Sequence, residues 1–511
     1  MGPMRRRHLV LAVEICLAVV YCAAMVGVVE GLGPNVDEGV YTQQAWRILQ
    51  GQVPYRDFFL HQTPLYLYQQ AGVFGVFGGV TLLTMRLPSV VAIALSGVFL
   101  SRWTTRITGF WQAGVVAEFV WLMSPQQYDV AIAIPNALAI LCALVALYID
   151  AGRGRYRRWT SALWFVLALL AKPTAIVFGI ALLLPQGGQS PTDRLRQIFW
   201  PLATVSLVAF LVLLAMSDGR FGSLMLAQFA RFGRNSGYRV LMDNTLMQMM
   251  ADRLGATTVF AWNWRTVAQA YGILRASYVA AFAPLSIAAG AAALGYGHWR
   301  NCGWVVRGWQ RSLLILGVIV ISLIWVWDPT WPHYAAMALV PLAALAGQIG
   351  YGVWLRVVGG RAVTQVIATL ILGVILTAWI AAHAPRPTDY FSHMTDLLEP
   401  QDPRPVLSFY PAVSLLAGRK TACDFIDPLN YTGSIRDILV DASNIGVRVD
   451  AGSELRKCAD AQGALVWLDV YFVFFTARDP QWHKWLRTLE PERVVFESEV
   501  ARYYYTTGTL P

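Results

Sequence analysis

The chain has 511 residues, of which 56% are hydrophobic and only 14% charged, whereas soluble proteins carry roughly 25% charged residues. This composition excludes a disordered chain, a collagen and a disulfide-rich miniprotein, and it predicts a polytopic membrane protein. The net charge of +10 does not indicate nucleic-acid binding. The basic residues stand in short clusters between apolar runs, such as 5–7 and 153–158, which is how the positive-inside rule sets topology.

The first apolar run, Leu9–Val29, follows a basic N-terminus. Its length of about 20 residues is enough to cross a hydrocarbon core of ~30 Å. The apolar region of a secretory signal peptide is shorter, at about 7–15 residues. We therefore interpret this run as a membrane anchor rather than as a cleaved signal.

Further apolar runs of spanning length follow. They are Leu82–Leu100, Thr108–Met123, Val130–Ile149, Phe199–Met216, Gly272–Tyr296, Ser312–Trp327, Tyr334–Gly352 and Ala362–Ala382. One more run, at 159–185, is interrupted by Lys172 and Pro173. As a single helix it would turn the later Arg-rich loops outward, whereas two short helices that meet at Lys172 keep these loops inside. The second interpretation gives eleven passes, with the N-terminus inside and the C-terminus outside.

On this topology three regions face outward: residues 30–81, residues 217–269 and everything after residue 383. The first of them contains two amphipathic stretches, Val36–Gln50 and Pro64–Gly78, which predict two helices.

After Pro385 the composition changes, because Pro, Asp, Glu and Arg become common. Strand-like runs occur at Val406–Tyr410, Ala464–Phe475, Arg493–Phe496 and Arg502–Thr506, and a helix is predicted over Asp479–Glu490. The predicted fold is therefore a polytopic all-α membrane domain of about 11 transmembrane helices at 1–383, followed by a small soluble α/β domain at 384–511. Cys423 and Cys458 lie in the second domain, where a disulfide could persist outside the cytoplasm.

The acidic pair Asp37 and Glu38 begins the first amphipathic helix. Carboxylates at a helix N-terminus are stabilised by its dipole, so this pair is compatible with a surface helix of no further function. Asp129 follows in a very short outer loop. Lys172 is the only lysine of the membrane domain, which suggests a compact charge for a phosphate, although a lysine that snorkels to the interface would look the same.

Other polar groups at the same membrane level are His61, Arg56, Asp57, Asp328, His333, Tyr334, Arg231, Arg234 and Arg239. A lone histidine in such a place is more often a structural hydrogen-bonding residue than a ligand. Glu14 and Glu118 lie inside apolar spans, and such acids are candidates for function or for pairing with a neighbouring helix. A carboxylate can take a proton from an acceptor hydroxyl, and cations can stabilise a departing phosphate. The sequence has no Walker loop, no catalytic Ser-His-Asp set and no metal-ligand spacing.

Several motifs resemble the opening of GT-C glycosyltransferases, in particular the bacterial group of protein O-mannosyltransferases and lipid A aminoarabinose transferases. They are Asn35–Tyr41 (NVDEGVY), Gly51–Phe58 (GQVPYRDF), Pro64–Tyr68 (PLYLY) and Met85–Pro88 (MRLP). Ala171–Ala175 (AKPTA), and His333-Tyr334 with Pro341, are similar to later motifs. Val406–Phe425, with its Tyr-Pro and Ala-Gly-Arg, looks like the C-terminal domain of some members.

The resemblance implies an inverting transferase that needs no metal or other cofactor and uses a polyprenyl-phosphate sugar at the outer face of a bacterial cytoplasmic membrane. It implies that Asp37 is the catalytic base, that Glu38 is its neighbour and that Asp129 is a second acidic position. Donor-phosphate candidates are Lys172, Arg56, His61, Arg231 and Arg234. Candidate substrate-binding residues are Tyr41, His333 and Tyr334.

The chain departs from the pattern at one place. Relatives that modify lipid A often carry Lys-Pro at the start of the second amphipathic helix, where this chain has Thr63-Pro64. His61 lies two residues earlier. A histidine in place of the lysine would make stabilisation of the leaving group sensitive to pH.

The expected partners are a lipid-linked sugar donor, a glycan, lipid or protein acceptor and the membrane. An oligosaccharide or O-antigen ligase is the nearest alternative, and it would leave a diphosphate carrier instead of a monophosphate. A secondary transporter would show repeated halves with broken helices at the midplane, and no repeat is visible. A membrane scaffold would not need Asp37, Asp129 and Lys172 on one face. The sugar and the acceptor stay open.

Overall fold

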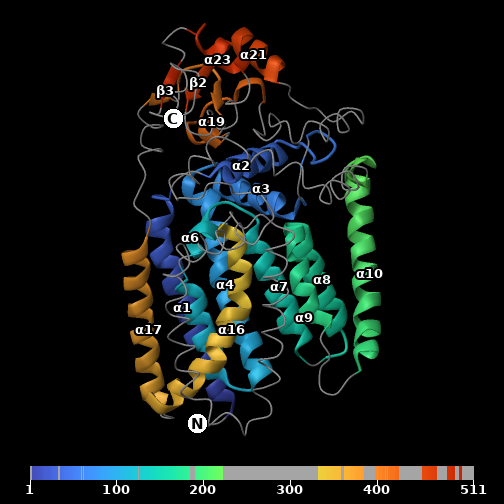
Figure 1. Cartoon of the computed structure of the whole chain (residues 1–511), viewed down its shortest axis with the longest axis vertical. Helices are drawn as coiled ribbons and strands as arrows, with labels where there is room; N and C mark the ends of the chain where they lie inside the picture. The colour runs from blue at the N-terminus through green and yellow to red at the C-terminus, as the bar shows by residue number, and fades with distance from the viewer. Residues whose placement is uncertain are drawn as a thin grey trace, which may run out of the picture. The chain divides into compact units, whose positions relative to one another are not determined.

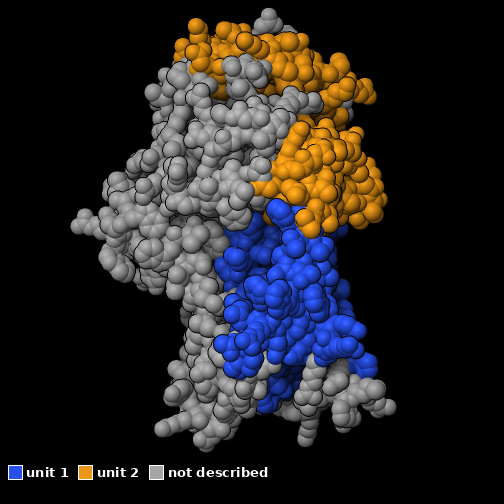
Figure 2. Space-filling view, turned by 90° about the vertical axis from the view of Figure 1, so that its right-hand side faces the viewer, with its two compact units in different colours: residues 1–32, 86–210, 272–386 blue, residues 33–85, 211–271, 387–511 orange. Residues whose placement is uncertain are grey.

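The computed structural model describes residues 3–32, 35–58, 60, 63–124, 126–152, 154–183, 190–222, 332–357, 362–384, 397–399, 401–408, 410, 412–424, 452–468, 480–489 and 494–497. The chain divides into two compact units, which Figure 2 shows in blue and orange. Unit 1 comprises residues 1–32, 86–210 and 272–386, and unit 2 comprises residues 33–85, 211–271 and 387–511. The predicted spans Gly272–Tyr296 and Ser312–Trp327 lie outside the described residues.

The helices that lie wholly or mainly in unit 1 follow most of the predicted apolar runs. They are α1 (Pro3–Val29), α4 (Leu82–Thr108), α5 (Trp111–Leu122), α6 (Gln126–Ala131), α7 (Asn136–Asp150), α8 (Arg157–Ala171), the 3₁₀ helix η1 (Pro173–Phe178), α9 (Gly179–Leu183), α10 (Pro191–Met216), α16 (Pro332–Val357) and α17 (Ala362–His383). Among the described residues, three helical stretches, His8–Val29, Leu82–Thr108 and Thr192–Met216, are long and apolar enough to cross a membrane. The total of eleven passes stays a prediction.

Close helix contacts and indole hydrogen bonds hold unit 1 together. A Cβ at Gly347 of α16 would meet the backbone oxygen of Ala113 in α5, so only glycine allows these two helices to approach this closely. Trp121 of α5 is buried and donates from Nε1 to the carbonyl of Ile93 in α4 at 3.0 Å. Helices α1 and α17 lie side by side (Figure 1).

The arginine of the Met85–Pro88 motif caps the C-terminal end of α1 by hydrogen bonds to backbone carbonyls. Arg86 is fully buried, and its guanidinium donates to the carbonyl oxygens of Val29 at 2.5 Å and Leu32 at 2.9 Å. The last carbonyls of a helix have no partner within the helix, and a buried cation satisfies them well. This motif residue therefore has a structural role in unit 1.

The apolar run at 159–185 is broken at Lys172, as the second interpretation of the sequence requires. Helix α8 ends at Ala171, and Lys172 adopts an extended conformation, with φ −154° and ψ 123°. Proline disfavours the helical conformation in the residue before it, and Pro173 instead starts the 3₁₀ helix η1.

The chain reverses its direction at this break. Asp150, at the end of α7, accepts a hydrogen bond from Arg158 at 2.5 Å and pairs with Arg194. Arg158 precedes the broken run and Arg194 follows it, so the chain returns to the end of unit 1 from which it started. A Cβ at Gly179 would lie 3.0 Å from the ring of Phe165, which confirms that the returning segment packs back onto α8. A single crossing helix is therefore wrong.

Removal of the Asp150 carboxylate is expected to destabilise unit 1 at the end of α7. Asp150 is 3% exposed and Arg194 is fully buried, and removal of one partner from a buried ion pair typically costs about 3–5 kcal/mol because a charge stays uncompensated. We expect Asp150→Asn to lower the melting temperature in detergent clearly. Asp193→Asn, at an exposed residue of α10, should leave it almost unchanged. Equal melting temperatures for D150N and D193N would contradict this expectation.

In unit 2 the two amphipathic stretches form helices with nearly the predicted bounds. Helix α2 is Val36–Leu49 and α3 is Leu65–Phe77, and they pack against each other (Figure 1). A Cβ at Gly75 of α3 would come within 3.2 Å of the Leu49 side chain, so the glycine permits the close approach. Gly78 ends α3 in the left-handed conformation, with φ 74°, as is common at helix ends.

The described C-terminal segments of unit 2 contain a parallel three-stranded sheet in the order β1-β2-β3. The strands are β1 (Val406–Ser408), β2 (Leu465–Leu468) and β3 (Val494–Glu497), and the helices are α19 (Ala412–Leu416), η2 (Ala422–Asp424), α21 (Gly452–Ala461) and α23 (Pro480–Leu486). Three of the four strand-like runs therefore hold a strand, and α23 lies inside the predicted helix. The fourth run, Arg502–Thr506, lies outside the described residues. Helix α21 was not predicted.

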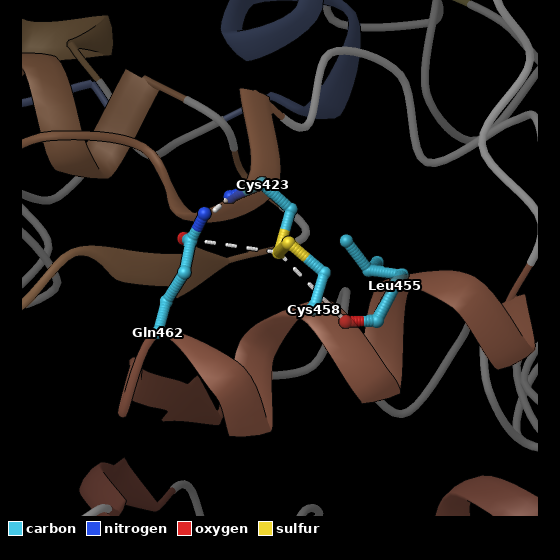
Figure 3. The surroundings of a disulfide bond; sticks show 4 residues. All are labelled: Cys423, Leu455, Cys458 and Gln462. Atoms are coloured by element: carbon cyan, nitrogen blue, oxygen red, sulfur yellow. Dashed lines mark hydrogen bonds between the residues drawn. A yellow bond between two sulfur atoms is a disulfide. The ribbon is translucent and has the colours of Figure 1, made fainter.

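Cys423 and Cys458 form a disulfide that joins η2 to α21, with the two Cα atoms 5.9 Å apart (Figure 3). The amide of Cys423 also donates to Gln462 Oε1 at 3.0 Å. The sequence did not decide whether this disulfide forms, and the structure contains it.

Loss of the bridge is expected to loosen the C-terminal segments. A disulfide that closes a loop of 35 residues stabilises a fold by about 4 kcal/mol in the chain-entropy model. We expect dithiothreitol to lower the unfolding temperature of the wild type but not that of Cys423→Ser. If wild type and variant respond alike to the reductant, the bridge is not formed in the purified protein.

Candidate functional site

The acidic pair lies in the first turn of α2. Asn35 is the N-cap residue, and its side chain accepts a hydrogen bond from the Asp37 amide at 3.0 Å. The cap fixes this turn in the helical conformation, and in a helix successive side chains point in different directions. Asp37 is partly exposed whereas Glu38 is fully buried. Of the two carboxylates, only that of Asp37 is therefore in contact with solvent.

Glu38 is held by a residue from the C-terminal part of unit 2. Its Oε2 accepts a hydrogen bond from the hydroxyl of Tyr410 at 3.1 Å, and the Tyr410 side chain is also fully buried. A buried carboxylate needs such donors. Helix α19, which follows Tyr410, packs on α2.

Tyr41, a candidate for substrate binding, lies one helical turn after Asp37. Its side chain is 3% exposed. Its ring meets that of Tyr66 in α3 edge to face, with the ring centroids 5.8 Å apart. In this structure Tyr41 therefore contributes to the contact between α2 and α3.

Arg56, a candidate for binding the donor phosphate, pairs with the residue beside it. Its guanidinium donates to both oxygens of Asp57, at 3.0 Å and 2.8 Å. These hydrogen bonds lower the pKa of Asp57 below its usual range, so the carboxyl is ionised at neutral pH. Arg220 donates to the backbone oxygen of Arg56 at 2.9 Å. A phosphate at Arg56 would have to compete with Asp57.

Lys172 lies in unit 1 and is only 3% exposed. Its ammonium donates to Asn136 Oδ1 at 2.7 Å, and Asn136 is the first residue of α7. A snorkelling lysine would extend its charge to the surface, so that interpretation does not fit. The structure shows a buried cation at the point where the chain reverses.

The remaining candidates have no described side chain. Asp129 lies in α6, and His333 and Tyr334 lie in α16, but only their backbones are described. His61, Arg231 and Arg234 lie outside the described residues, as do Arg239 and Asp328. Their assignments stay predictions.

The two acids inside the apolar spans belong to unit 1. Glu14 of α1 accepts a hydrogen bond from Ser101 at 2.7 Å and pairs with Arg102 at 2.5 Å, both from α4. Glu118 of α5 is fully buried. The sequence offered no partner for Glu14, because Ser101 and Arg102 are distant in the chain. The pairing favours helix association as the role of Glu14.

The structure groups the predicted residues by unit. Asp37, Glu38, Tyr41 and Arg56 belong to unit 2, and Lys172 and Asp129 belong to unit 1. Sequence reasoning missed Asn136 as the partner of Lys172. It noted the Tyr-Pro motif at Tyr410 but gave it no role. The sequence did carry one signal for Asn136, because it is a polar residue directly after a proline at the start of an apolar helix.

No protein-family model and no curated protein matches the sequence. Among solved structures, the Archaeoglobus fulgidus oligosaccharyltransferase in complex with zinc and sulfate is 13% identical, with a TM-score of 0.47 over 80% of this chain and 62% of that chain. The apo structure of ArnT from Cupriavidus metallidurans is 14% identical, with a TM-score of 0.48 over 93% and 95% of the two chains. The same ArnT bound to undecaprenyl phosphate is 14% identical, with a TM-score of 0.38 over 97% and 90%. The chain thus spans 62% of the length of the oligosaccharyltransferase and 95% of the length of apo ArnT.

Proposed function

We propose that this protein is an integral-membrane glycosyltransferase that moves a sugar from a polyprenyl-phosphate donor to a hydroxyl acceptor. The acceptor would be a lipid-linked glycan, a cell-envelope polysaccharide or a protein. The observation that carries the proposal is the capped turn of α2, where Asp37 is partly exposed and Glu38 is buried against Tyr410.

In the proposed reaction the acceptor oxygen attacks the anomeric carbon of the donor sugar. The bond from this carbon to the phosphate oxygen breaks, and its electron pair leaves with polyprenyl phosphate. Attack from the opposite side inverts the configuration at the carbon. The Asp37 carboxylate takes the proton of the acceptor hydroxyl, as a general base does.

Lys172 is the proposed contact of the donor phosphate. A compact ammonium that is held by Asn136 at 2.7 Å is already oriented, and little reorganisation is needed when charge grows on the departing phosphate. The reaction as proposed needs no metal ion. We also propose that it takes place on the outer face of a bacterial cytoplasmic membrane, with the N-terminus in the cytoplasm.

The first test is a panel of labelled polyprenyl-monophosphate sugars offered to the purified protein with its membrane lipids. We expect transfer, or slow hydrolysis to free sugar, with release of polyprenyl monophosphate, and we expect EDTA to leave the rate unchanged. Turnover of diphosphate carriers only would favour the ligase. If no donor of either kind is turned over, the transferase is excluded and the transporter and scaffold interpretations return.

A further inference from the structure

Tyr410 links the acidic pair to a part of the chain far away in sequence. The hydrogen bond from its hydroxyl to Glu38 Oε2 spans 372 residues, and both side chains are fully buried. A carboxylate shielded from water interacts strongly with any donor that remains. The position of Glu38 is therefore coupled to the position of Tyr410.

The backbone of Tyr410 is itself fixed between β1 and α19. Ser408, the last residue of β1, accepts from the Tyr410 amide at 3.0 Å and donates from the same hydroxyl to the Tyr410 carbonyl at 3.1 Å. These two bonds close a tight turn. The turn leaves the phenol ring to extend towards α2, on which α19 packs.

The Ala-Gly-Arg motif at residues 417–419 forms hydrogen bonds that hold the segments on either side of this turn. Gly418 ends α19 in the left-handed conformation with φ 66°, and the next amide, Arg419, donates to the Ser414 carbonyl at 2.7 Å, as at many helix ends. The Arg419 guanidinium donates to the carbonyl of Glu399 at 2.8 Å and to that of Arg404. The segments before β1 and after α19 are thereby joined, and Tyr410 lies between them.

We propose that Tyr410 is a positioning residue of the transferase, and that the C-terminal segments thereby complete the catalytic turn of α2. The proposal rests on the function proposed above. By donating to Glu38, Tyr410 holds this carboxylate inside the protein and directs part of its negative charge away from the neighbouring Asp37. Asp37 alone then faces the acceptor hydroxyl.

The test is a double-mutant cycle of Tyr410→Phe and Glu38→Ala, measured as kcat and KM for donor turnover. Phenylalanine removes only the hydroxyl, so we expect kcat to fall about tenfold, as for one lost hydrogen bond to a charged group, with KM for the donor unchanged. Because Tyr410 acts through Glu38, Y410F should slow an enzyme that already carries E38A no further. Additive effects of the two changes would overturn the proposal.

Tyr66→Phe is the matched control, because Tyr66 is also buried in unit 2 and its hydroxyl accepts a hydrogen bond from Gln70 at 2.7 Å. Y66F should lose similar stability and keep kcat. If Y410F does not fold, Ser408→Ala frees the turn instead, and it should also lower kcat and be non-additive with E38A. If the wild type is active and Y410F has the same kcat, this proposal is overturned but the proposed function is not. Wild type that turns over no donor overturns the proposed function and this proposal with it.

Discussion

Asp37→Asn is expected to lower donor turnover by roughly 100-fold or more, because a positioned general base contributes about 10²–10⁴ to a rate. The change keeps the size of the side chain and removes only its ability to take a proton. The backbone amide at position 37 still donates to Asn35, so the first turn of α2 should stay intact. Donor binding, measured separately with a labelled polyprenyl-phosphate sugar, is expected to persist.

Asp193→Asn provides the control. Asp193 also lies in the first turn of a helix, α10, and its amide donates to the Ser190 hydroxyl at 3.1 Å. D193N makes the same carboxylate-to-amide change at a helix N-terminus, and we expect it to leave donor turnover unchanged. Equal turnover in wild type and D37N would keep the enzyme and remove Asp37 as its base.

Lys172→Met is expected to weaken binding of the donor phosphate by roughly 10- to 100-fold, since hydrogen bonds to charged groups contribute about 1.5–3 kcal/mol and each 1.4 kcal/mol is tenfold. Methionine fills a similar volume without the charge. The direct measurement is the affinity for undecaprenyl phosphate, which carries the phosphate and the lipid but no sugar.

Asn136→Asp is the matched second variant. It keeps the lysine but places a carboxylate where the amide oxygen now lies 2.7 Å from the ammonium. A carboxylate would compete with the phosphate for the same charge, so N136D should also weaken binding while it preserves the fold. If K172M and N136D both bind undecaprenyl phosphate as wild type does, the phosphate is bound elsewhere.

The sequence by itself determined the local features of this protein. The amphipathic spacing predicted α2 and α3 within a residue or two, because the apolar face of a helix is set by residues three or four apart in the chain. The break at Lys172 followed equally directly from Pro173, which restricts the residue before it. The charge distribution predicted that the chain reverses there.

Only the tertiary structure decided which side chains meet. Tyr410 reaches Glu38, Asn136 holds Lys172, and Asp150 joins Arg158 to Arg194. Each of these pairs depends on the packing of elements that the sequence separates, and no periodicity encodes the partner of a buried polar group. Burial explains why these partners matter, since a charge that leaves water must find its donors or counter-ions inside the protein. The sequence thus located the acidic pair and the lysine, and folding supplied the residues that hold them.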